Sequence, residues 1–427
     1  MDHCREANKK KLHGKMKTEN RVVCFKDVPL NTTSIPQALL NIEKKERSNP
    51  FPWNGQFSPQ FVQALLQKYS TRDSLIFDPF AGSGTVLYEA GRENLQAIGS
   101  ELNPAAYIMA RTYRFINVEH QKRKPYIEEI DDVLERVVRC NLPLFVNGPI
   151  SVDISEEIKC ELLNTHKELQ NSMSKHLFET LIVRLDFYRP NLDGHKIFKI
   201  WNDLKKFIME LPYSNKPVDI LNCDARRLPL RSNLIDLVIT SPPYINVLNY
   251  HQQYRDSIEA LGWNILAVAK SEIGSNRKNR GNRFLTVIQY CLDIAQALSE
   301  IKRVCQHTSR IIFVVGKESR IRSTRFLNGQ IVAALGVYCA GLNLETRQER
   351  VFRNKFGEMI YEDILHFIPS TKKDKDLLKE ARNVAKEVLK DAIKRAPKES
   401  KNDISSALEC LNGVQPSAFY EQMRQVG

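Results

Sequence analysis

Several features that would place this chain in a familiar class are missing from its sequence. It has no run of about 18 apolar residues, so we expect no membrane-spanning helix. Its basic start, residues 1–17, is not followed by an apolar stretch and does not resemble a secretory signal. Its nine cysteines include no CxxC pair, which argues against a zinc ribbon and a disulfide framework. We therefore expect a cytoplasmic protein with reduced cysteines and without a metal site.

What the chain has in surplus is positive charge. Its formal net charge is +13 over 427 residues. Lys and Arg side chains neutralise phosphates, so this surplus favours a nucleic-acid partner, although a soluble surface alone would also explain it. With 42% hydrophobic and 26% charged residues, the chain can bury a core.

Strand and helix patterns alternate in two parts of the chain, which predicts an α/β fold with a parallel, doubly wound, Rossmann-like sheet. Strands are predicted at 75–77, 97–100, 218–221, 234–240 and 311–315, with a late edge strand at 361–367. Helices are predicted at 35–45, 59–68, 86–93, 104–114 and 289–304.

The stretch between the two α/β parts lacks this alternation and has helical, amphipathic patterns. We therefore divide the chain into an extension, a first α/β part, a helical insertion that is a candidate for target recognition, a second α/β part and a charged helical tail. These parts cover residues 1–50, 51–115, 116–215, 216–370 and 371–427.

The first chemical motif is the turn DPFAGSGT at residues 78–85, between a strand and a helix. Gly82 and Gly84 let backbone N–H groups approach a ligand, and Asp78 can accept hydrogen bonds from it. A P-loop is excluded because no Lys follows Gly84, and a dinucleotide fingerprint lacks its third glycine. S-adenosylmethionine fits, since it has an amino-acid tail and no pyrophosphate, while a tight turn without a ligand is the plainer alternative.

Glu101 follows the second strand directly, in the sequence GSELNP. An acid at this place can hold the hydroxyls of a ribose, as in other nucleoside-binding sheets. The competing interpretation is an ordinary exposed Glu. Because the residue ends a strand next to the glycine turn, we favour a role in cofactor binding.

The second chemical motif is Ser241-Pro242-Pro243-Tyr244, which follows a fully apolar strand. The prolines fix the backbone and remove two N–H donors, so the Pro242 carbonyl is a free acceptor. An exocyclic amino group of a base is a poor nucleophile. Hydrogen bonds to the Ser241 hydroxyl and the Pro242 carbonyl would aim its lone pair at a methyl donor, while Tyr244 could hold the extruded base. A stiff loop without chemistry is the alternative.

At these residues the sequence resembles the DNA amino-methyltransferases, which make N4-methylcytosine or N6-methyladenine. The motif DPFAGSGT resembles their cofactor turn, and TSPPY resembles the catalytic motif of the cytosine-N4 branch. No Pro-Cys dipeptide, the nucleophile motif of methylation at ring C5, occurs in the chain. The resemblance implies a Rossmann-like class I methyltransferase fold, the cofactor S-adenosyl-L-methionine and DNA as the partner. It implies a cofactor role for Phe57, Ser58, Asp78, Pro79, Phe80, Gly82, Ser83, Gly84, Thr85, Glu101 and Asp224.

The resemblance leaves alternatives within and outside this family. Adenine N6 is the nearest, and a tRNA guanine-N2 methyltransferase is disfavoured because only about fifty residues precede Phe51. A non-catalytic nucleic-acid-binding protein is disfavoured because both motifs are intact. The resemblance also makes a restriction-modification system with a cognate endonuclease, and association with the nucleoid, candidate contexts. A basic loop after the catalytic motif is a candidate phosphate contact through Arg277, Lys278, Arg280 and Arg283.

Overall fold

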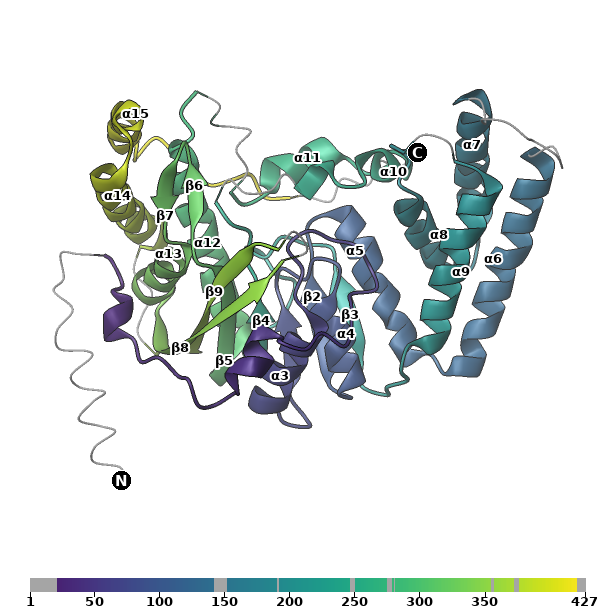
Figure 1. The fold of residues 1–427 in the computed structure, drawn as a ribbon, viewed down its shortest axis with the longest axis horizontal. Helices are drawn as coiled ribbons and strands as arrows, with labels where there is room; N and C mark the ends of the chain where they lie inside the picture. The colour runs from purple at the N-terminus through teal and green to yellow at the C-terminus, as the bar shows by residue number, and fades with distance from the viewer. Residues whose placement is uncertain are drawn as a thin grey trace. The chain divides into compact units, whose positions relative to one another are not determined.

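The computed structural model describes residues 21–141, 152–189, 192–245, 250–274, 279, 281–354, 357–371 and 376–420. It divides into two compact units (Figure 1). The glycine-turn unit comprises Lys44–Ala225, Asn249–Ser271 and Tyr420–Gly427, and the proline-loop unit comprises Met1–Glu43, Arg226–Leu248 and Glu272–Phe419. Within the described part of the chain, no helix is both long and apolar enough to cross a membrane.

Three parallel strands form the sheet of the glycine-turn unit, in the order β3-β2-β1. They are β1 (Leu75–Asp78), β2 (Gln96–Ser100) and β3 (Val218–Leu221). All four residues of β1 are buried, as expected for a strand that is covered on both faces. The connecting helices are α3 (Pro59–Tyr69), α4 (Thr85–Arg92) and α5 (Pro104–Arg111). The predicted strand–turn–helix pattern is thus confirmed in this unit.

The predicted helical stretch consists of long helices in its described residues. These are α6 (His120–Asn141), α7 (Val152–Glu168), α8 (Ser172–Leu185) and α9 (Gly194–Glu210). Arg123 ties α6 to the end of α9, because its fully buried guanidinium donates to the carbonyls of Ile208 and Leu211 at 2.8 and 2.6 Å. Two shorter helices, α10 (Arg255–Ala260) and α11 (Ile265–Ser271), belong to the same unit.

Four strands form the sheet of the proline-loop unit, in the order β4-β5-β9-β8. Strands β4 (Ile235–Thr240) and β5 (Cys305–Gly316) are parallel, and β9 (Met359–Pro369) and β8 (Leu342–Arg353) continue the sheet antiparallel. Helix α12 (Leu285–Val304) connects β4 to β5 and is largely buried. The remaining elements are a hairpin, β6 (Ser319–Ile321) and β7 (Thr324–Phe326), and the helices α2 (Gln37–Asn41), α13 (Asn328–Ala334), α14 (Leu377–Arg395) and α15 (Lys398–Glu409). The mixed α/β fold with mostly parallel strands that the sequence predicts is confirmed.

The prediction of a late edge strand at 361–367 was wrong in one respect. The strand exists as β9, but it pairs with β5 on one side and with β8 on the other, so it is an inner strand. Strand β8 was not predicted, because its sequence LNLETRQERVFR is rich in charged residues and has little apolar alternation. Charged side chains are typical of edge strands, where they discourage pairing with other chains.

Candidate functional site

The glycine turn has the backbone conformation that its sequence predicts. Gly82 has a φ of 52° and Gly84 a φ of 89°, both in the left-handed region that favours glycine. Gly84 is also the residue before α4, and a β-carbon there would lie 2.8 Å from the ring of Tyr113. The buried Asp78 carboxylate accepts a hydrogen bond from the N–H of Phe80 at 3.1 Å. The turn is therefore fixed on its inner side by close packing.

Glu101 is held against this turn. Its carboxylate accepts hydrogen bonds from the N–H of Gly82 at 2.8 Å and from the N–H of Asn103 at 2.7 Å. The side chain of Asn222, in the loop after β3, donates to the carbonyl of Glu101 at 2.9 Å. The structure thus brings together the ends of β1, β2 and β3, including Asp78 and Glu101, as the sequence predicts for a cofactor site. Asp224, two residues after Asn222, is buried.

The segment before α3 lies over the same turn, and most of its contacts had no signal in the sequence. The indole of Trp53 approaches Gly82 so closely that a β-carbon there would lie 3.2 Å from it. The side chain of Gln56 accepts a hydrogen bond from the Ser83 hydroxyl at 2.8 Å. Trp53 also stacks on Tyr250 with ring centroids 6.0 Å apart. Trp53 has no local signal for this contact, because Gly82 lies about thirty residues further along the chain.

Three polar atoms in this part of the glycine-turn unit fit a polar ligand. Among the described residues, the buried Ser58 hydroxyl, the Asn103 side-chain amino group and the Asn222 side-chain carbonyl have no hydrogen-bond partner. They offer a hydroxyl, a donor and an acceptor, and burying such groups unpaired costs free energy. Asn103 and Asn222 flank Glu101, and Ser58 directly precedes α3. The donor set therefore fits a nucleoside ligand with an amino-acid tail.

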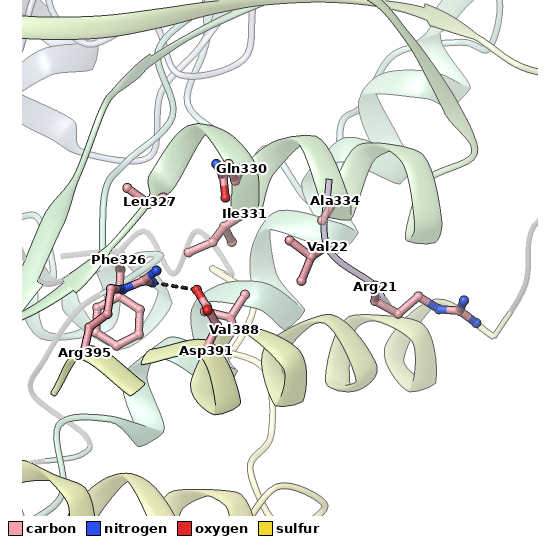
Figure 2. Close-up of a pocket in the computed structure, with 10 residues that line it drawn as sticks. All are labelled: Arg21, Val22, Phe326, Leu327, Gln330, Ile331, Ala334, Val388, Asp391 and Arg395. Atoms are coloured by element: carbon pink, nitrogen blue, oxygen red, sulfur yellow. Dashed lines mark ion pairs between the residues drawn. The ribbon is translucent and has the colours of Figure 1, made fainter. Parts of the chain in front are cut away.

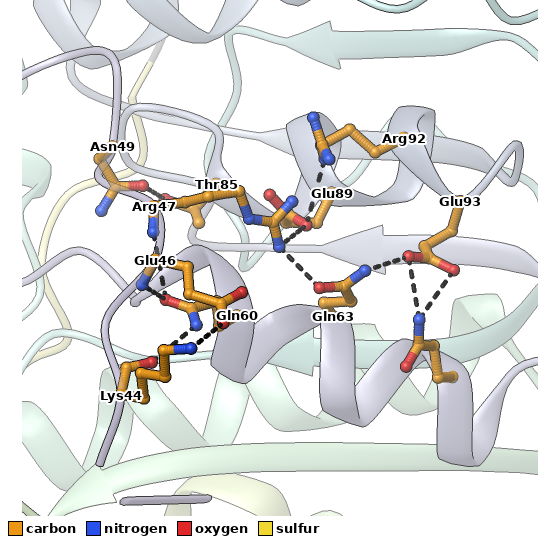
Figure 3. Close-up of polar contacts among 11 residues, drawn as sticks. Lys44, Glu46, Arg47, Asn49, Gln60, Gln63, Thr85, Glu89, Arg92 and Glu93 are labelled. Carbon is orange, nitrogen blue, oxygen red and sulfur yellow. Dashed lines mark hydrogen bonds and ion pairs between the residues drawn. The ribbon is translucent and has the colours of Figure 1, made fainter. Parts of the chain in front are cut away.

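A polar network fastens the chain between residues 44 and 49 to α3 and α4 (Figure 3). Asn49 bridges the segment before α3 and the start of α4, since its side chain donates to the Phe57 carbonyl at 2.6 Å and accepts from the Thr85 hydroxyl at 3.0 Å. Arg47 donates to the carboxylate of Glu89 at 3.0 Å. Glu89 is fully buried in α4, and burial raises its pKa to about 7, although the positive charge of Arg47 acts to lower it. Through Asn49 and Arg47, the same segment of the chain contacts both Thr85, next to the glycine turn, and the titratable Glu89.

We expect Glu89 to make folding less favourable as the pH rises. Its carboxyl has a pKa of about 7 in the folded protein and 4.5 in the unfolded chain. The folded state therefore holds the extra proton between these values, so the contribution is full below about pH 4.5 and is lost as the pH rises through 7. A shift of this size corresponds to about 3 kcal/mol. Thermal unfolding of the wild type and of Glu89→Gln, measured from pH 5 to 8, tests this.

The amide of Glu89→Gln imitates the protonated acid and does not titrate. The wild type is expected to lose stability relative to the variant as the pH rises through this range. Because other titrating groups are common to both proteins, they cancel in the difference. Two stability curves that run parallel from pH 5 to 8 would contradict the assignment.

The second motif lies at the carboxyl end of β4, in the proline-loop unit. Ser241 follows Thr240 directly, Pro242 is buried and Pro243 is half-buried. The Ser241 hydroxyl lies 3.1 Å from the hydroxyl of Tyr244, within hydrogen-bond distance. The loop therefore closes on itself through its first and last side chains, an arrangement that the spacing alone did not predict.

Tyr244 packs against the end of the neighbouring strand. A β-carbon on Gly316, the last residue of β5, would lie 3.2 Å from the Tyr244 ring, so a larger residue there would crowd the ring. Burial, together with the negative charge of Glu362, raises the pKa of Tyr244 well above its usual value. The phenol stays protonated at neutral pH and can donate to the Ser241 hydroxyl oxygen. That oxygen keeps a lone pair free for a second donor.

The predicted phosphate-binding loop lies mostly outside the described residues, as Arg277, Lys278 and Arg280 do. Arg283 is described and is exposed just before α12. A separate pocket lies between α13, α14 and the chain at Arg21–Val22 (Figure 2), where Arg395 pairs with Asp391 at 2.6 Å. None of the residues singled out in the sequence lines this pocket.

Comparison with known proteins gives one matching family model and two related methyltransferases. The N6/N4 DNA methylase model matches residues 5–111. Type II methyltransferase M.MjaII of Methanocaldococcus jannaschii is 20% identical over 440 residues, covering 75% of this chain and 81% of that protein. Type II methyltransferase M.MvaI of Kocuria varians is 22% identical over 228 residues, covering 44% of this chain and 50% of that protein.

The solved structures that the chain matches include methyltransferases. An S-adenosylmethionine-dependent methyltransferase of Methanosarcina mazei is 9% identical with a TM-score of 0.33, and covers 72% of this chain and 98% of that one. The rRNA methyltransferase aviRa of Streptomyces viridochromogenes is 12% identical with a TM-score of 0.28, and covers 79% of this chain and 93% of that one. At these scores the structural likeness carries no argument, and any link to a family rests on the sequence matches.

Proposed function

We propose that the chain methylates the exocyclic N4 amino group of cytosine in DNA. The proposal starts from the DNA amino-methyltransferase family, which the sequence matches support. At the coarser level, the chain is an S-adenosylmethionine-dependent DNA methyltransferase. When bound, S-adenosyl-L-methionine supplies an electrophilic methyl group. The side chains of the protein orient the amino group and select the base.

The observation that carries the proposal is the position of Ser241 at the end of β4, with its hydroxyl 3.1 Å from that of Tyr244. If Tyr244 donates to Ser241, the serine oxygen presents its remaining lone pair to an N–H of the base. The carbonyl of Pro242 accepts the second N–H, and the proline ring after it keeps that carbonyl in place. Two acceptors of this kind draw the amino nitrogen towards sp³ geometry and orient its lone pair.

Serine in the first position of this motif supports cytosine rather than adenine. The resemblance places Asp or Asn there in most adenine enzymes and Ser in the cytosine-N4 branch. A base must leave the duplex before its amino group can reach such a loop. We propose that the half-buried ring of Tyr244 also contacts the extruded base, while its hydroxyl positions Ser241.

The proposed cofactor residues divide by the part of the ligand that they would hold. Glu101 would accept hydrogen bonds from the ribose hydroxyls. Asn103 and Asn222, which each have an unpaired side-chain atom, are hydrogen-bonded to Glu101. Asp224 would contact the adenine. Phe57, Ser58 and Asp78 would meet the methionine end, together with the turn residues Pro79, Phe80, Gly82, Ser83, Gly84 and Thr85.

A restriction-modification context is part of the proposal, because both relatives are named as type II methyltransferases. A cognate restriction endonuclease would then cut the same site when it is unmethylated. In cells that express such an endonuclease, expression of this chain would be expected to protect the host DNA from cleavage.

The proposed activity is tested by incubating the full chain with mixed-sequence DNA and isotopically labelled S-adenosylmethionine, followed by mass spectrometry of the nucleosides. We expect label in N4-methylcytosine. Label in N6-methyladenine would overturn the choice of base, and label only in an RNA substrate would overturn DNA as the substrate. A Ser241→Ala protein prepared in the same way controls for contaminating methyltransferases.

A further inference from the structure

The hairpin β6–β7, labelled in the proline-loop unit in Figure 1, has two chemically different faces. Its side chains alternate strictly between buried and exposed positions, as in a strand pair with one face on the core. The buried face ends in Phe326, whose ring lies 6.2 Å from that of Phe284. The exposed face carries arginines only, apart from the serine in the turn: Arg320, Arg322, Ser323 and Arg325.

The hairpin directly follows the strand against which the proposed catalytic loop packs. Strand β5 ends at Gly316, which packs against the ring of Tyr244, and β6 begins three residues later at Ser319. The side chain of Asn328, after the hairpin, donates to the Gly316 carbonyl at 3.1 Å and to the Ser319 hydroxyl at 2.9 Å. The hairpin is thus anchored at both ends to the strand end that Tyr244 contacts.

The tip of the hairpin is held as well. The carbonyl of Arg322 accepts a hydrogen bond from the Ser400 hydroxyl of α15 at 3.3 Å, and its guanidinium pairs with Asp403. Side chains presented by a fixed scaffold lose less conformational freedom when they bind a partner. The arginines are therefore preorganised on a rigid support rather than on a loose loop.

The charges on this face remain available to a partner. Arg320 and Arg325 share one carboxylate, Glu318, at 3.2 and 2.7 Å, and their side chains are 64% and 52% exposed. Exposed ion pairs of this kind are weak, and one carboxylate cannot neutralise two guanidinium groups. Beside the hairpin, the Lys317 amino group lies 5.7 Å from the centre of the half-exposed ring of Tyr361.

We propose that the arginine face of the β6–β7 hairpin binds the phosphate backbone of the DNA whose base enters the Ser241–Tyr244 loop. Arginine is suited to this task because its planar fork donates two hydrogen bonds to one phosphate. Phosphate contacts fix the register of a duplex without reading its sequence. The inference rests on the proposed function, since it assigns a role on the substrate of that same site.

The experiment measures duplex DNA binding by fluorescence anisotropy as a function of salt concentration. Arg320→Gln/Arg325→Gln is compared with the wild type and with Lys386→Gln/Lys390→Gln, which removes the same charge from exposed positions of α14. Each phosphate contact contributes about 0.9 to the salt slope, so the hairpin variant should lose nearly two units of slope and bind at least about tenfold more weakly. The α14 variant should bind as the wild type does.

A variant of opposite sign makes the test sharper. Glu318→Gln removes the carboxylate that competes for Arg320 and Arg325, so it is expected to bind DNA more tightly and with a steeper salt slope. If the wild type methylates DNA but all variants share its affinity and slope, the hairpin is not a DNA contact and the proposed function stands. If the wild type neither binds nor methylates DNA, both the hairpin proposal and the proposed function are overturned. The same holds if the hairpin substitutions weaken binding only to RNA.

Discussion

Turnover of DNA methylation is expected to fall by about 100- to 1000-fold when Ser241 is replaced by alanine. The substitution removes one of the two acceptors proposed for the amino group and leaves the rigid backbone of Pro242 and Pro243 intact. Cofactor binding should be nearly unchanged, because Ser241 belongs to the proline-loop unit while the glycine turn belongs to the other. Single-turnover methylation and calorimetric titration with S-adenosylmethionine measure the two effects separately.

Tyr244→Phe is the matched control for this prediction. It keeps the ring that packs on Gly316 and removes only the hydroxyl 3.1 Å from Ser241. If that hydroxyl positions the serine, turnover should fall by a smaller factor, about 10-fold, equivalent to about one hydrogen bond. Ser241→Ala losing turnover and cofactor affinity to the same extent would mean that the loop is structural and that its chemistry lies elsewhere.

Replacing Asp293 by alanine is expected to destabilise the proline-loop unit by about 3–5 kcal/mol. Asp293 pairs with Arg226 at 2.8 Å, and both side chains are completely buried. The same carboxylate accepts the N–H and the hydroxyl of Ser417 at 2.8 and 2.7 Å. Alanine would leave the Arg226 charge without its counter-ion in the interior, and two donors of Ser417 without an acceptor.

Asp391→Ala provides the control, since it breaks an ion pair of the same type at the surface of the same unit. Asp391 and Arg395 are each 41% exposed and lie 2.6 Å apart, so their loss should cost less than about 1 kcal/mol. Denaturant unfolding of the two variants compares these losses directly. Equal losses of unfolding free energy in the two variants would show that the buried ion pair stabilises the protein no more than the exposed one.

The buried pair also holds the described segment after α15 against the core of the proline-loop unit. Besides the Asp293 contacts, Arg226 donates to the carbonyls of Ser417 and Ala418, both at 2.8 Å, and lies over the ring of Phe419. From its sequence, this region is expected to be only a charged helical tail. The segment after α15 instead returns to the core, where the carbonyls of Ser417 and Ala418 accept hydrogen bonds from the buried Arg226 guanidinium.

Much of the fold could be predicted because its elements have strong local patterns. The runs at 75–77, 218–221 and 234–240 are apolar and short, as buried parallel strands are, and the structure places β1, β3 and β4 there. The same logic failed for β8. Strand β8 pairs with the inner strand β9 and makes a single bridge to Leu30 on its other side, so its strand conformation is decided by these partners and not by its own composition.

Local sequence determined the glycine conformations at 82 and 84, the placement of Asp78 and Glu101 at strand ends and the bend of the Ser-Pro-Pro-Tyr loop, because each follows from the backbone preferences of a few neighbouring residues. Only the tertiary structure decided that Trp53 and Gln56 cover the glycine turn, that Tyr244 packs on Gly316, and that the arginines of the β6–β7 hairpin share one exposed face. These contacts join residues that are distant in the chain. They form because folding buries apolar surface and pairs polar groups across elements, which no local pattern encodes.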